Sequence, residues 1–266
     1  MDLQLQGKRA LVTGGSKGIG KAIALQLARE GVDVVIAARN EADLAAAQRD
    51  ISAETGRKVV AIAVDTKSDA SVKALIEGAV AALGGIDILV NAAAQAGGQA
   101  PPPKLAQVTD PVFWDDVDVK VMGYLRTARE AASHMAAQGW GRIINVSGLA
   151  ARQTGSIVGS MRNVAVAALT KNLADELGPK GINVTVVHPG LTRTEKTGPL
   201  VAARAAAAGV SEAEIEQRQS ANILIGRMVE AAEVADIVAF LASPRSVAIN
   251  GDAIACGGGI KGAIHY

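Results

Sequence analysis

A glycine-rich run near the amino terminus is the part of the sequence with the clearest chemistry. The segment TGGSKGIG, residues 13–20, follows a short apolar run and leads into a helical pattern. Glycines in such a turn let the backbone approach a pyrophosphate, and the first amides of the helix point at the anion. A glycine turn made only for close packing is the alternative. We expect a nucleotide site formed by Gly14, Ser16, Lys17, Gly18, Ile19 and Gly20.

The segments that must position this turn alternate between short apolar runs and longer amphipathic ones. The apolar runs are β-branched and bounded by glycine or polar residues, as buried strands are. They cover residues 9–15, 33–39, 59–65, 86–93, 141–147 and 182–190, with a weaker candidate at 251–257. Such alternation predicts an α/β fold, a doubly wound, Rossmann-like parallel sheet of about seven strands with helices on both faces. We expect one domain over residues 1–266, with a helical lid inserted at about 195–221.

Composition excludes several classes of protein. Lys and Arg number 27 against 26 Asp and Glu, and no basic face is visible, which argues against nucleic acid or a membrane surface as partner. The single cysteine, Cys256, rules out an intrachain disulfide. Metal-ligand spacing is absent, so we expect no metal. The start of the chain lacks the layout of a signal peptide, and no apolar run could span a bilayer. We expect a cytoplasmic protein.

The sequence resembles the short-chain dehydrogenase/reductase family from Gly7 to Gly259. The motifs that carry the resemblance are TGGSKGIG, an Asp closing the third strand (Asp65), LVNAAA, GRIINVSG, ALTKNLADELGPKGINV and HPGLTRT. The resemblance implies an oxidoreductase with a nicotinamide cofactor. It also implies a homotetramer or homodimer formed through the helices at about 111–137 and 159–177, although their Ala-rich faces would equally suit packing on the sheet.

The resemblance also implies which cofactor is used. Members that prefer NAD place a carboxylate at the end of the second strand, whereas this chain has Arg39 there and Lys17 in the glycine turn. Two cations near the adenosine ribose favour a 2′-phosphate, so NADP(H) is the expected cofactor and NAD(H) remains possible. Solvated surface charges are the alternative. The remaining cofactor residues implied are Asp65 at the adenine, Thr194 at the nicotinamide carboxamide, and Thr66, Asn91, Pro189 and Gly190.

The catalytic half departs from the family pattern. The Tyr, Lys and Asn that family members use fall on Gly159, Asn163 and Lys120, and the family's Ser falls on Ser147 or, shifted by one, on Gly148. The exchange of Asn and Lys is reciprocal, and Lys120 and Asn163 should lie on neighbouring helices. An amine there could stabilise alkoxide charge, or Lys120 could be a solvated lysine.

We expect Ser147 to polarise the substrate oxygen and Lys120 to supply positive charge near Asn163. Water or Ser160 would relay the proton. Tyr124, one helical turn after Lys120, and the terminal Tyr266 are less favoured donors. The expected function is an NADP(H)-dependent oxidoreductase with a non-standard site and an apolar carbonyl or alcohol as small-molecule substrate. An inactive NADP(H)-binding sensor or scaffold and a non-redox reaction in the altered cleft are the alternatives.

Overall fold

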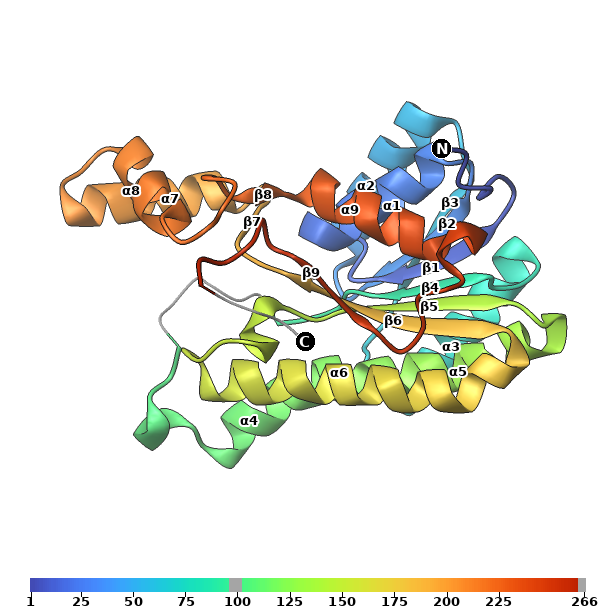
Figure 1. The fold of residues 1–266 in the computed structure, drawn as a ribbon. Coiled ribbons are helices and arrows are strands. Elements are labelled where there is room, and N and C mark those ends of the chain that lie inside the picture. Colours follow the sequence, from blue (N-terminus) through green and yellow to red (C-terminus); the bar gives the residue numbers. More distant parts are fainter. Residues whose placement is uncertain (96–101, 263–266) are drawn as a thin grey trace.

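Seven parallel strands in the order β3-β2-β1-β4-β5-β6-β9 form the central sheet of the computed structural model, which describes residues 1–95 and 102–262 (Figure 1). The strands are β1 (Arg9–Thr13), β2 (Asp33–Ala38), β3 (Val59–Ala63), β4 (Ile88–Asn91), β5 (Gly141–Val146), β6 (Ile182–Pro189) and β9 (Ala253–Cys256). The chain order reverses beside β1, which pairs with both β2 and β4. The predicted doubly wound sheet is therefore confirmed.

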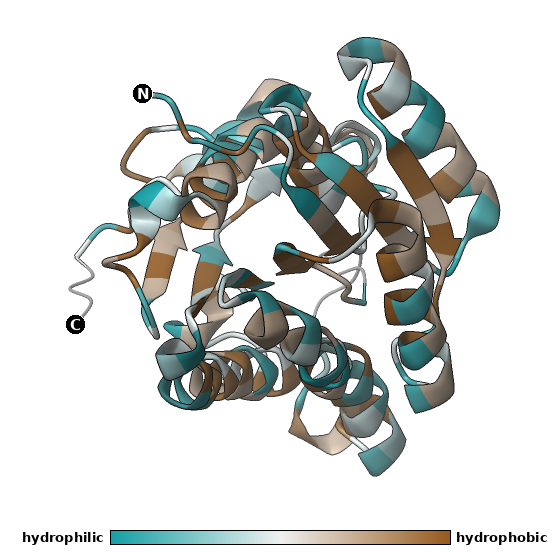
Figure 2. Ribbon diagram, turned by 90° about the vertical axis from the view of Figure 1, so that its right-hand side faces the viewer, coloured by the Kyte–Doolittle hydropathy of each residue, from teal (hydrophilic) through white to brown (hydrophobic). Residues whose placement is uncertain are grey.

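Helices cover both faces of this sheet. One face carries α1 (Gly18–Arg29), α2 (Glu41–Thr55) and α9 (Ala231–Ala242); the other carries α3 (Asp69–Leu83), α5 (Gly123–Gln138) and α6 (Ile157–Leu177). Each layer buries an aliphatic cluster against the strands, long stretches of which are brown in the hydropathy view (Figure 2). Burial on both sides explains the near-continuous apolar runs of the strands. No described helix combines the length and apolarity needed to cross a membrane.

Capping residues set the limits of several helices. Asn40 and Ser68 accept hydrogen bonds from the first turns of α2 and α3, and Gly56 and Gly84 end these helices in the left-handed conformation. Ser156 accepts a hydrogen bond from the Gly159 amide at the start of α6. Side-chain acceptors satisfy amides that the helix itself leaves open, and glycine adopts a positive φ without strain.

A helix with a π turn precedes β5. It consists of α4 (Asp110–Val117), the π turn η2 (Asp118–Met122) and α5, and it runs without a break. In the part of the chain that the structure describes, four short 3₁₀ turns complete the framework: η1 (Leu105–Gln107), η3 (Leu149–Ala151), η4 (Gly178–Lys180) and η5 (Pro244–Ser246). A π turn displaces the side chains of one helical turn and is frequent at functional sites. Here the displaced turn contains Lys120.

A smaller unit interrupts the alternation after β6. The strands β7 (Thr192–Arg193) and β8 (Val229–Glu230) pair in parallel, and between them the chain forms α7 (Thr197–Ala208) and α8 (Glu212–Ser220). These two helices project beyond the carboxyl ends of the main strands and have their own small apolar cluster (Figure 1). We call Thr197–Ser220 the α7–α8 segment.

Candidate active site at the carboxyl ends of the strands

A cleft of about 1220 Å³ lies along the carboxyl ends of the main strands and under the α7–α8 segment. Residues from the β1–α1 turn, the ends of β2 to β6, the π turn, α6 and α7 line it. In an open parallel sheet, ligands bind outside the carboxyl ends where the strand order reverses, which here is beside β1. The cleft contains most of the residues that the sequence predicts to be functional.

The glycine turn is built for close approach. A Cβ added to Gly14 would lie 2.7 Å from the Ala92 carbonyl O, and one added to Gly20 would lie 2.2 Å from the Gly14 carbonyl O. The Gly18 amide donates hydrogen bonds of 3.2 and 3.1 Å to the two carboxylate oxygens of Glu195. The turn thus already holds an anionic group at the start of α1, and this fits a cofactor with a pyrophosphate.

The cations expected at the adenosine end lie beside the cleft. Lys17 forms an ion pair of 2.7 Å with Asp43. Arg39 is exposed at the end of β2 and lines the cleft together with Asp65. The Asp65 carboxylate accepts a hydrogen bond of 3.0 Å from the Lys67 amide, which holds the loop after β3 in place. Arg39 is therefore the better placed of the two cations to meet a phosphate.

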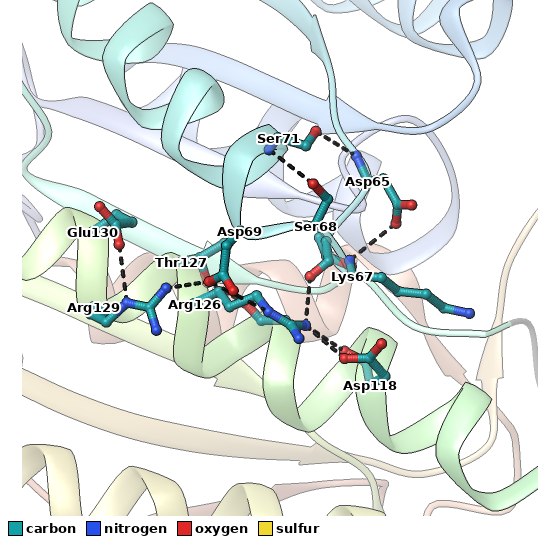
Figure 3. A network of polar contacts seen from close by, with 12 residues as sticks. Asp65, Lys67, Ser68, Asp69, Ser71, Asp118, Arg126, Thr127, Arg129 and Glu130 are labelled. Atoms are coloured by element: carbon teal, nitrogen blue, oxygen red, sulfur yellow. Dashed lines mark hydrogen bonds and ion pairs between the residues drawn. The ribbon is translucent and has the colours of Figure 1, made fainter.

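The loop after β3 is tied to the helix that carries Lys120 (Figure 3). Arg126 of α5 donates to the Thr66 carbonyl O at 3.0 Å and to Asp118 at 2.7 Å. The Thr66 hydroxyl donates to the Val119 carbonyl O at 3.2 Å. These bonds fix the π turn against the cofactor half of the cleft, so the two halves of the site share one support.

The expected nicotinamide end is formed where β6 leaves the sheet. Pro189, Gly190 and Thr194 line the cleft, and the methyl group of Thr194 is the nearest atom to the Cβ position of Gly18. The Thr194 amide donates to the Thr197 hydroxyl at 2.9 Å. The N-cap of α7 is Lys196, so capping does not account for Thr194.

Asn91 does not line the cleft, contrary to its predicted place among the cofactor residues. Its side chain is fully buried, donating to Asn145 at 3.0 Å and accepting from the Thr127 hydroxyl at 2.7 Å. Asn91 and Asn145 are register partners on β4 and β5, so their side chains share the face that packs on α5 and α6. Thr170 of α6 accepts from Asn145 and extends this network. The side chain is therefore used within this buried network.

Three of the predicted catalytic residues meet at the end of β5. Lys120 Nζ donates to the Ser147 carbonyl O at 2.9 Å, and the Ser147 hydroxyl donates to Asn163, whose carbonyl O and Oδ1 lie 3.1 and 3.2 Å away. All three residues are buried and line the cleft. The helices thus bring Lys120 and Asn163 to the same serine. Lys120 is not a solvated lysine, since only 4% of it is exposed.

The hydroxyl groups of Ser160 and Tyr124, which the sequence offers for the proton, lie elsewhere. The Ser160 hydroxyl donates to the Gln153 carbonyl O at 2.9 Å, and Ser160 does not line the cleft, contrary to its predicted relay role. Tyr124 is 1% exposed, its hydroxyl donates to the Val146 carbonyl O at 2.9 Å, and burial raises its pKa. Tyr124 is thus a core residue. Tyr266 lies outside the described residues.

Arg162 is a site residue that the sequence motifs do not reveal. It precedes Asn163 on α6, lines the cleft, and pairs with Asp116 of α4. Burial, followed by the positive charge of Arg162, lowers the pKa of Lys120 to about 7, while Asp116 opposes this shift. The only signal in the sequence is that Arg162 lies next to Asn163, a predicted site residue. Within the described residues no cluster of His, Cys, Asp or Glu could hold a metal ion.

Known proteins share this architecture over their whole length. A family model described as “Enoyl-(Acyl carrier protein) reductase” matches residues 14–261. The 3-oxoacyl-[acyl-carrier-protein] reductase of Aquifex aeolicus is 32% identical, covering 98% of this chain and 100% of the relative. The L-sorbose reductase of Gluconobacter frateurii, solved with NADPH and L-sorbose, has a TM-score of 0.92 at 29% identity, covering 99% and 100%.

A second solved structure, a 7α-hydroxysteroid dehydrogenase with NADH, has a TM-score of 0.85 at 29% identity, covering 97% of this chain and 96% of its own. Both structures contain a nicotinamide cofactor, although not the same one. The sheet order, the glycine turn and these full-length matches lead to one conclusion: the chain belongs to the short-chain dehydrogenase/reductase family.

Proposed function

We propose that this protein is an NADP(H)-dependent oxidoreductase that interconverts a small carbonyl compound and its alcohol. The observation that carries this proposal is the single cleft that joins the glycine turn and Arg39 to the buried group of Lys120, Ser147 and Asn163. Its relatives include reductases solved with NADPH. A site for a dinucleotide beside a cation and a hydroxyl suits hydride transfer, because that reaction develops charge on oxygen.

The residues proposed to hold the cofactor fall into three groups along the cleft. The glycine turn and the start of α1 receive the pyrophosphate, Arg39 and Lys17 receive the 2′-phosphate, and Thr194 receives the nicotinamide end. A bound nicotinamide would supply or accept the hydride. The arginine guanidinium can form two parallel hydrogen bonds to a phosphate. The end of β2 carries no carboxylate, the group that would bind the ribose hydroxyls of NAD.

Ser147 and Lys120 are proposed to act on the substrate oxygen. The Ser147 hydroxyl now donates to Asn163, and rotation about its side-chain bond would redirect the hydrogen to a substrate carbonyl. Lys120 has one of its three ammonium hydrogens engaged by the Ser147 carbonyl O, which leaves others to face the cleft. Leu149, Val201 and Met228 in the lining support an apolar substrate body.

The experiment that tests this function is a fluorescence titration with NADPH, followed by NADPH oxidation assays over a panel of ketones and aldehydes. We expect saturable binding and turnover of at least one apolar carbonyl compound. No binding would refute the nucleotide role as well as the reaction.

A sensor or scaffold that binds NADP(H) without hydride transfer is the second candidate. One observation favours it: Gly159 leaves the family's Tyr position without a side chain, and Ser156 beside it is used as the N-cap of α6. Tight NADPH binding without turnover of any compound in the panel would select this candidate.

A further inference from the structure

The reduction of a carbonyl requires a proton as well as a hydride. The question at this site is which group donates the proton. The hydroxyls of Ser160 and Tyr124 are outside the cleft and are bonded to backbone carbonyls. At the end of β5 the cleft offers the hydroxyl of Ser147, the amide of Asn163 and the ammonium group of Lys120. Of these three groups, only an ammonium can release a proton near neutral pH.

We propose that Lys120 is the general acid of the carbonyl reduction and gives its proton to the oxygen that Ser147 orients. This inference rests on the proposed function. It assigns to Lys120 a task beyond electrostatic stabilisation, since a fixed positive charge need not lose its proton.

The ammonium group is held at the residue that is proposed to orient the substrate oxygen. Nζ lies 2.9 Å from the carbonyl O of Ser147, the same residue whose hydroxyl is proposed to hold the substrate oxygen. The π turn brings the side chain in from α4 and α5, and the bonds from Thr66 and Arg126 hold that turn in place. A general acid must be positioned within hydrogen-bond reach of the oxygen that it protonates.

The surroundings of Lys120 make its proton available. Burial is the largest effect on its pKa, which falls to about 7, and Arg162 of α6 lowers it further while Asp116 of α4 raises it. From α5, the un-ionised Tyr124 is bonded to Val146, and Arg126 is paired with Asp118 of the π turn. From β5 the ammonium group meets only the uncharged Ser147 carbonyl. The arrangement favours an amine that changes its protonation state near neutral pH.

The step balances in atoms and charge. The carbonyl carbon gains a hydride from dihydronicotinamide, the substrate being reduced and the nicotinamide oxidised. The π electron pair of the C=O bond moves to oxygen, an O–H bond forms, and an N–H bond of the Lys120 ammonium breaks. The neutral amine afterwards takes a proton from water.

The direction of the pH dependence follows from this step. Reduction requires the ammonium form, so its rate should fall as pH rises through about 7. Oxidation of the alcohol requires the neutral amine, so its rate should rise over the same interval. If Lys120 supplied only positive charge, both reduction and oxidation would require its protonated form, and both rates would fall as pH rises.

Two variants and a labelling measurement test the inference. Lys120→Arg keeps a positive charge but removes the titratable proton, and we expect kcat for reduction to fall by roughly 100-fold or more. Arg162→Gln removes the neighbouring cation, and we expect the pH limb to move to higher pH. Lys73→Met, an exposed lysine on α3, is the matched control and should leave the rate unchanged.

The second readout is the pH dependence of acetic anhydride labelling of Lys120 in the protein without cofactor, followed by mass spectrometry. The inference is supported if labelling has a midpoint near pH 7 and if kcat for reduction falls in Lys120→Arg. A midpoint near an ordinary lysine value, about 10.4, overturns it. If Lys120→Arg reduces the substrate at the wild-type rate and with the wild-type pH profile, the inference is also overturned. The proposed function then stays intact. Absence of wild-type turnover, by contrast, removes the proposed function and the inference together.

Discussion

Arg39 is the residue on which the choice between the two nicotinamide cofactors depends. It lies exposed at the end of β2, while Lys17 is already paired with Asp43. We expect Arg39→Ala to weaken NADPH binding by about 10-fold or more, because a charge-assisted hydrogen bond contributes about 1.5–3 kcal/mol. NADH binding should change little. Parallel fluorescence titrations with both cofactors measure this, and equal losses would contradict a phosphate role for Arg39.

The hydroxyl of Tyr124 is expected to stabilise the fold and to take no part in catalysis. Its buried hydroxyl donates to the Val146 carbonyl O, one residue before Ser147. We expect Tyr124→Phe to lower the free energy of unfolding by about 1 kcal/mol, the usual net value of such a bond, and to leave kcat unchanged. Urea denaturation and steady-state kinetics check the two parts. A large loss of kcat in a stably folded variant would return Tyr124 to the list of proton donors.

At the scale of elements, Glu195 links the approach to the α7–α8 segment with the start of α1. Its carboxylate occupies the Gly18 amide, which is the donor proposed for the pyrophosphate. Two anions cannot share this amide, so the carboxylate must move away when a dinucleotide binds. A charge at a helix N-terminus contributes about 0.3–1 kcal/mol, and we therefore expect Glu195→Gln to tighten NADPH binding by roughly two- to fivefold.

The matched control for this prediction is Glu212→Gln, at the exposed first turn of α8 and away from the glycine turn. Its Kd for NADPH should equal that of the wild type. Weaker binding in Glu195→Gln would mean that the carboxylate supports the cofactor site rather than competing for it.

At the scale of the whole molecule, the outer surfaces of α4 and α6 are unusually apolar. Trp114 on α4 and Val164 on α6 are 59% and 51% exposed. Exposed apolar patches on soluble domains are often interfaces, and the helices concerned include those for which the family resemblance implies assembly. We expect the double variant Trp114→Lys/Val164→Lys to form a smaller assembly than the wild type in light scattering after size exclusion. Leu224→Lys, an exposed apolar residue outside these helices, should not change the mass.

The helices and strands could be predicted because the hydrophobic pattern of each segment indicates which of its residues are buried. The strands β2 and β5 form buried, β-branched runs that start at the expected residues, Asp33 and Gly141. The glycine turn could be predicted because only glycine fits where the Gly14 and Gly20 positions meet backbone atoms. Such requirements are local, so composition and spacing along the chain record them.

Side-chain direction explains why two of the predicted site residues do not line the cleft. Asn91 belongs to a family motif, yet its place on β4 turns the side chain away from the cleft. Ser160 follows Gly159, but one residue along a helix is a large rotation, and the Ser160 hydroxyl donates to the Gln153 carbonyl O. The sequence does not point to Arg162, because its partner, Asp116, is on another helix.

By itself, the sequence determined the sheet and the glycine turn. Hydrophobic period and residue type are sufficient for these features. Only the tertiary structure decided that Lys120 is buried at the Ser147 carbonyl, that Tyr124 is a core residue and that Glu195 occupies the Gly18 amide. These outcomes depend on how helices and loops far apart in the chain meet at one sheet edge. Burial and neighbouring charges shift the pKa of the Lys120 amine, and both arise only once these helices and loops have packed together.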